Sequence, residues 1–132
     1  MATITGVTFA FAPQTPPQAA VGITTINYSY TLNCVGPECG AVSFNVTVDV
    51  VGVDPVLNGL LASGVDAHTT PCPASRRGAA SVVIPRSFDI STAKLNEDTF
   101  SADDIQLVVN ARPTGGGGVL VTGASPVVQG NF

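Results

Sequence analysis

Charged residues are scarce in this sequence. Only 11% of the 132 residues are Asp, Glu, Lys or Arg, against about 25% in typical globular domains. The net charge is −4, and the densest basic feature is the dipeptide Arg76-Arg77. A protein that binds nucleic acid needs a basic stripe to neutralise phosphates, and none is present. We therefore expect no nucleic-acid partner.

Long hydrophobic runs are also missing. No segment approaches the ~20 apolar residues that a membrane-spanning helix requires, so we expect no membrane span. The N-terminal residues MATITGVTFAFAPQ lack the basic and long apolar regions of a secretory signal. We expect either a protein made without such a signal or one whose signal has been removed.

Side chains suited to catalysis are few. The single histidine, His68, lies in a Thr- and Pro-rich stretch, and no nucleophile-elbow motif occurs. Acids gather in the segment from Glu97 to Asp104, which a solvated turn explains. The alternative to a solvated turn is a calcium site that uses these carboxylate oxygens as ligands, although the spacing of an EF-hand is absent. We expect no enzyme, no catalytic residue and no cofactor.

Aromatic residues make up only 6% of the chain, and tryptophan is absent. Tyr28 and Tyr30 alternate with polar residues in a way that places both on the apolar face of a strand. The sequence therefore offers no exposed aromatic platform on which a sugar could stack. This argues against a carbohydrate-binding module.

Helical periodicity is nearly absent, whereas alternation of apolar and polar residues is common. The clearest alternating runs predict strands within residues 20–34, 41–53, 82–90 and 105–111. Weaker strands are expected at 3–11, 56–66 and 119–128. Turn-forming stretches separate these runs, at residues 13–18, 35–40, 53–55, 69–78 and 113–118.

Short strands with regular turn signals are typical of a β-sandwich. The chain length fits one domain, and neither a repeat nor a shift in composition divides it. We predict a single all-β domain over residues 1–132, an immunoglobulin-like antiparallel β-sandwich of seven to eight strands. The glycine run at 115–118 is expected to be a hairpin loop.

The runs 20–34 and 41–53 are close in sequence, and we expect them to pair as a hairpin. Setting Tyr30 opposite Phe44 places apolar residues opposite each other along the whole pair. The same register places Cys34 opposite Gly40 rather than Cys39. We predict that Tyr30 and Phe44 are buried neighbours on paired strands.

Three interpretations of Cys34 and Cys39 follow, in decreasing order of preference. The first is a hairpin turn, the second a disulfide within the loop, and the third a metal site. A zinc site would need four ligands, and the sequence contains only four cysteine or histidine residues: Cys34, Cys39, Cys72 and His68. We expect no metal, and the odd cysteine count leaves at least one thiol outside any internal disulfide.

The segment AKLNEDTFSADDIQLVV, residues 93–109, resembles the corner between the fifth and sixth core strands of immunoglobulin variable domains. Leu95, Glu97, Asp98 and Thr99 match the short pattern found there. The paired cysteines, the core tryptophan and the corner tyrosine of that family have no counterpart. The resemblance implies an immunoglobulin-like or fibronectin-III-like sandwich and no particular function.

The scarcity of catalytic side chains and charge favours a structural or adhesive module. Small sandwiches of this type resemble the decoration, capsid or tail proteins of bacteriophages, so we expect a virion subunit that binds protein partners. An extracellular fibre or pilus-type subunit that exchanges a terminal strand is the alternative, and a carbohydrate-binding module is a third. The terminal segments carry no charge, unlike guarded strand edges. The expected assembly contacts are Val7, Phe9, Phe11, Val127, Val128 and Phe132.

Overall fold

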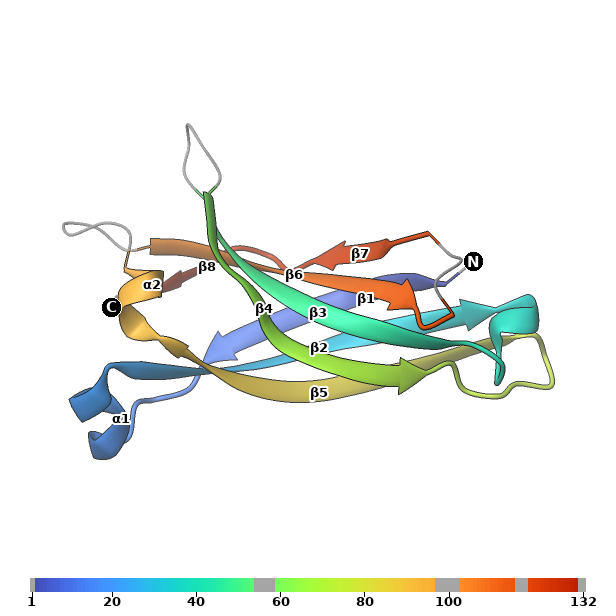
Figure 1. Cartoon of the computed structure of the whole chain (residues 1–132), viewed down its shortest axis with the longest axis horizontal. Helices are drawn as coiled ribbons and strands as arrows, with labels where there is room; N and C mark the ends of the chain where they lie inside the picture. Colours follow the sequence, from blue (N-terminus) through green and yellow to red (C-terminus); the bar gives the residue numbers. More distant parts are fainter. Residues whose placement is uncertain (1, 54–58, 97–102, 116–118, 131–132) are drawn as a thin grey trace.

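Eight strands form two antiparallel sheets that pack face to face (Figure 1). The computed structural model describes residues 2–53, 59–96, 103–115 and 119–130. The elements in chain order are β1 (Thr3–Phe11), α1 (Pro16–Val21), β2 (Ile23–Val35), the 3₁₀ turn η1 (Gly36–Glu38), β3 (Ser43–Gly52), β4 (Gly59–Pro71), β5 (Ala79–Ser91), α2 (Thr92–Leu95), β6 (Asp103–Pro113), β7 (Val121–Ala124) and β8 (Val128–Gly130).

The two sheets divide the strands unequally. One sheet has the order β1-β2-β5, and the other has the order β4-β3-β6-β7, with β8 also paired to β6. The predicted fold class, an all-β antiparallel sandwich of seven to eight strands, is confirmed. The second and third strands, β2 and β3, lie in opposite sheets.

Alternation along the strands supplies the core, because successive side chains of a strand point to opposite faces. Every second residue of β2, β3 and the described side chains of β6 is buried, and the residues between them are mostly polar. Tyr30 and Phe44 are both buried, as predicted. The largest fully buried side chains are Tyr30, Phe44, Ile26, Leu32, Leu95, Ile105 and Leu107.

The predicted hairpin between residues 20–34 and 41–53 is wrong. β2 pairs with β1 and β5, and β3 pairs with β4 and β6. Tyr30 therefore lies opposite Ile84, and Phe44 opposite Thr70 and Pro113. The chain crosses between the sheets at η1, where Gly36 adopts a φ of 62° that favours glycine. The apolar residues of β2 and β3 match in number and spacing, but this match is the same for two strands paired in one sheet and for two strands that face each other across the core.

The cysteines also pair differently from the prediction. The disulfide joins Cys34 to Cys72, with their Cα atoms 5.9 Å apart, and Cys39 is a half-buried free thiol. Cys34 is at the end of β2 and Cys72 follows β4, so the bond links the two sheets. Cys34 does not bond to Cys39, because its side chain points into the core, where Cys72, directly after β4 of the opposite sheet, is also buried.

The last strand is broken in two by Pro126. β7 pairs with residues 108–111 of β6, and β8 pairs with residues 103–105 on the same side. Between them the backbone N–H of Ser125 donates to the Leu107 carbonyl, and the Leu107 N–H donates to Ser125 Oγ. The Ser125 hydroxyl therefore replaces the backbone pairing that is lost where the strand is interrupted.

One long side of the sandwich is closed by direct contact between β1 and β7. A Cβ atom on Gly123 would lie 2.6 Å from Cγ2 of Ile4, so only glycine allows this approach. The opposite long side lies between β4 and β5, which belong to different sheets. That side is joined by the disulfide at one end and by a polar cluster in the middle.

Two short helices cap the strands. Residues 13–18 were expected to be a turn, but α1 begins inside them, with Thr15 and Gln18 forming a reciprocal capping box. α2 follows β5, and its Leu95 is fully buried. No helix in the described part of the chain is long and apolar enough to cross a membrane.

Candidate functional site

The residues predicted as assembly contacts are mostly used inside the molecule. Val7 and Phe9 are buried in the core of their own sandwich, and β1 pairs with β2. Phe11 and Val128 are half-buried against the same core. Val127 is 45% exposed. Phe132 lies outside the described residues, as does most of the acidic segment from Glu97 to Asp104.

The terminal strands therefore do not leave Val7 and Phe9 free to contact a second chain. Their lack of charge has a simpler explanation, which is that β1 pairs with β2 and β8 pairs with β6 inside this sandwich.

A cluster of five ionisable side chains occupies the side of the sandwich between β4 and β5. Tyr28 and Tyr30 come from β2, Asp66 and His68 from β4, and Arg86 from β5. The two residues from β2 are two positions apart, as are the two from β4, so each pair points to one face of its strand. Arg86 is the only member that β5 contributes. The cluster could not be predicted from the sequence, because its members are brought together only by the placement of the two sheets.

Asp66 is the centre of the cluster. Its Oδ2 accepts hydrogen bonds from the Tyr28 hydroxyl (2.5 Å) and from Arg86 Nε (2.7 Å). Its Oδ1 accepts a third bond from Arg86 Nη2 at 3.0 Å, which completes a two-pronged ion pair. The Asp66 side chain is 11% exposed and that of Arg86 is 35% exposed.

His68 completes the cluster on its inner side. The Tyr30 hydroxyl and His68 Nε2 are 2.6 Å apart, and His68 Nδ1 lies 3.8 Å from Asp66 Oδ2. The nearby carboxylate favours a proton on Nδ1, so the tyrosine hydroxyl donates to Nε2. Nδ1 is buried and makes no hydrogen bond to any described residue.

The electrostatics fix each group in one protonation state near neutral pH. Hydrogen bonds from Arg86 hold the pKa of Asp66 below its usual range, against the opposing effect of burial. Burial lowers the pKa of His68 and raises that of Tyr30 to about 12. Burial, followed by the bond to Asp66, also raises the pKa of Tyr28.

This arrangement ties the two sheets together rather than activating a group for chemistry. The carboxylate is a weak base, both tyrosines are weak acids, and the Nε2 lone pair of His68 is engaged by Tyr30. Proton transfer at neutral pH favours a group whose pKa lies near 7 and whose hydrogen bonds are free for a substrate. Among the described residues, no group of three or more His, Cys, Asp or Glu side chains is arranged to hold a metal.

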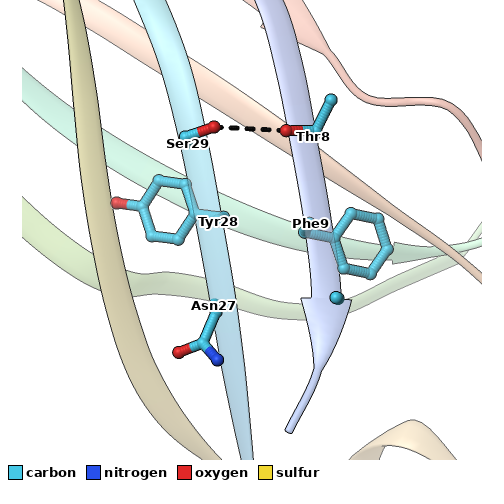
Figure 2. A pocket seen from close by; sticks show the side chains of 6 residues that line it. Thr8, Phe9, Asn27, Tyr28 and Ser29 are labelled. Carbon is cyan, nitrogen blue, oxygen red and sulfur yellow. Dashed lines mark hydrogen bonds between the residues drawn. The ribbon is translucent and has the colours of Figure 1, made fainter.

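A shallow hollow of about 310 Å³ lies between β1 and β2 (Figure 2). Its outward side chains are small and uncharged, and the Thr8 and Ser29 hydroxyls are 3.2 Å apart. Phe9 and Tyr28 alternate with them, but both are buried. The hollow thus offers a ligand few groups that are not already paired.

The edges of the sheets are a further candidate, because an unpaired strand edge can bind another strand. β4 is irregular in its pairing with β3 and directs Asp66 inward, and both features discourage pairing with a second chain. β1 contains an irregularity beside Gly6, whose φ is 60°. These two edges are therefore guarded.

β5 differs from both. It pairs with β2 continuously from Ala79 to Ser91 without a bulge, and with no other described strand. The segment Ala79–Ile84, which we call the β5 edge, contains no charged residue. Val83 within it is 65% exposed. Pro85 and Arg86 guard the strand only beyond this segment.

Comparison with known proteins adds no functional assignment. No family model and no curated protein matches the sequence. Among solved structures, the chain is similar to a Bordetella pertussis protein provisionally named ApaA, with 10% identity and a TM-score of 0.36. The match covers 98% of this chain and 89% of that one. At this level of similarity we base no argument on it.

Proposed function

We propose that this protein is a non-enzymatic structural subunit that joins other copies of itself through the β5 edge. The observation that carries the proposal is the regular, uncharged segment Ala79–Ile84, which pairs with β2 on one side and with no other described strand. Backbone N–H and C=O groups along such a segment form hydrogen bonds readily with a second strand. Antiparallel pairing of two β5 strands about a two-fold axis satisfies both chains at once.

The Cys34–Cys72 disulfide supports an assembly that works outside the reducing cytoplasm. Such bonds persist on virion surfaces and in extracellular proteins, and they are rare where glutathione keeps thiols reduced. We therefore propose a virion decoration, capsid or tail subunit, with an extracellular fibre subunit as the second candidate. In both, the chain contributes a repeated module and no chemistry.

Exchange of a terminal strand is less well supported than pairing at the β5 edge. β1 pairs with β2 in its own sheet and buries Val7 and Phe9, so releasing it would expose part of the core. β8 is paired with β6. Edge pairing needs neither strand to leave.

Adding a charge to the β5 edge tests the proposal. Val83→Lys places an ammonium group beside the pairing surface without touching the core, and we expect the assembled species to be lost while the monomer stays folded. Val21→Lys is the matched control, because Val21 on α1 is 71% exposed and its replacement adds the same charge. Mass is measured by sedimentation velocity.

Two results would refute the proposal. One is an unmodified protein that stays monomeric at high concentration in sedimentation velocity. The other is a Val83→Lys variant that assembles as readily as Val21→Lys. Circular dichroism of both variants establishes that they retain their β structure.

A further inference from the structure

A second hollow, on the outer face of the larger sheet, carries several N–H groups that make no hydrogen bond to a described residue. It has a volume of about 340 Å³ and is lined by Asn45, Thr47, Asn110, Arg112 and Leu120. Asn45 lies opposite Arg112 across the β3–β6 pair, and Thr47 lies opposite Asn110. Their core-facing neighbours are buried, so these side chains point outward.

Both asparagine side chains are oriented by neighbours. Asn45 Oδ1 accepts a hydrogen bond from the Thr69 hydroxyl at 3.0 Å, which leaves its amide N–H groups unused. Asn110 Oδ1 accepts from the Thr122 hydroxyl at 3.1 Å, and its Nδ2 donates to Asp49 at 3.1 Å. One Asn110 N–H therefore also remains available.

Arg112 adds a positive charge to these donors. Its guanidinium is exposed and pairs with no described residue. Asp49, the nearest acid along β3, is four residues beyond Asn45, about 13 Å at 3.3 Å per residue. Asp49 is also occupied by Asn110 and by the Gly64 N–H. Considering the described residues alone, the hollow thus combines one cation and several N–H donors that have no partner among them.

We propose that this hollow binds the carboxylate of an acidic saccharide. The Arg112 guanidinium matches a carboxylate in a two-pronged pair. Asn45 and Asn110 donate to ring or hydroxyl oxygens, Thr47 exchanges a hydrogen bond with a hydroxyl, and Leu120, 44% exposed, contacts an apolar part of the sugar. The proposal goes beyond the structural function and does not depend on assembly.

The balance of donors and acceptors favours a sugar over a peptide. A peptide carries backbone N–H groups that need acceptors, but each amide oxygen of the hollow already accepts one hydrogen bond, so the hollow offers few acceptors beside its many donors. A sugar hydroxyl can accept as well as donate, so it leaves no group unpaired against a donor-rich wall. The described residues that line the hollow include no aromatic side chain on which a sugar could stack. For an acidic sugar, the ion pair with Arg112 supplies the binding free energy that stacking supplies for a neutral one.

Side-chain NMR of the ¹⁵N-labelled protein tests the assignment. Methyl β-glucuronide and N-acetylneuraminic acid, added at millimolar concentration, should shift the Arg112 Nε–H signal and the Asn45 and Asn110 amide signals. The methyl ester of the glucuronide, which lacks the negative charge, should not. Arg112→Gln should raise the dissociation constant by about tenfold to a hundredfold. Arg76→Gln, which removes the same charge from the loop between β4 and β5 and does not line the hollow, should not change it.

The proposal is refuted if neither acidic sugar shifts these signals, or if Arg112→Gln binds as tightly as Arg76→Gln. It is also refuted if inorganic sulfate or an acetylated dipeptide with a free carboxylate competes as well as the sugars. The first of these competitors would show non-specific anion binding, and the second a peptide site. Assembly of the chain is unaffected by any of these results, so the two proposals fail separately.

Discussion

His68 is held neutral by its surroundings at pH 7. It is largely buried beside Arg86, and both burial and the nearby positive charge oppose its protonation, although Asp66 acts in the opposite direction. The pKa of His68 in the folded protein is therefore below its value in the unfolded chain. As the pH falls below about 6.5, the unfolded chain takes up a proton that the folded protein does not.

We predict that the free energy of unfolding decreases as the pH falls from about 7 to about 5. Urea denaturation at a series of pH values measures this directly, and His68→Gln should flatten the curve over that window. Asp66 acts in a different window: its lowered pKa stabilises the fold above about pH 4 and that contribution is lost on further acidification. Asp66→Asn should keep or steepen the slope between pH 7 and 5, because it removes a negative charge that favours protonation of His68. An unchanged slope in His68→Gln would contradict this account.

Burial of single residues could be predicted from the sequence, whereas the polar cluster could not. Alternation along a strand is sufficient to place Tyr30 and Phe44 in the core, because it depends only on local backbone geometry. The bond between Tyr28 and Asp66 joins residues 38 positions apart on different sheets. Nothing local to either residue indicates the other.

At the scale of elements, the predicted hairpin conflicted with the predicted fold. An immunoglobulin-like sandwich places its second and third strands in opposite sheets, so residues 20–34 and 41–53 could not pair if that fold was right. Sequence proximity favoured the hairpin, and apolar matching agreed with it. The same matching is expected for two strands that face each other across a core, which is what the structure shows.

The disulfide is the element-scale feature with the clearest effect on stability. Replacing Cys34 and Cys72 together with Ala should lower the free energy of unfolding by about 2–4 kcal/mol, because the bond restricts the unfolded chain between residues 38 positions apart. Cys39→Ser is the control and should change stability by less than about 1 kcal/mol. Urea denaturation gives both values.

Peptide mapping by mass spectrometry checks the pairing independently. The native protein should yield a Cys34–Cys72 peptide and one free thiol per chain at Cys39. A Cys34–Cys39 peptide, or a loss of stability on replacing Cys39 as large as that of the double variant, would contradict the observed connectivity.

At the scale of the molecule, the sequence predicts the class of fold but not its interaction surfaces. Low charge suggested an assembling protein and directed attention to the uncharged ends of the chain. The structure uses those ends internally and leaves the β5 edge unpaired instead. Which strand is an edge depends on sheet order, and sheet order is set by contacts between strands far apart in sequence.

Hydrogen exchange at the β5 edge tests the central claim most directly. In the assembled protein, backbone amides of Ala79–Ile84 that face away from β2 should be protected, because a second strand accepts their hydrogen bonds. The same amides in the monomeric Val83→Lys variant should exchange rapidly, while those of β2 remain protected in both. Equal, rapid exchange at the β5 edge in the assembled protein and in the variant would show that the subunits do not join there.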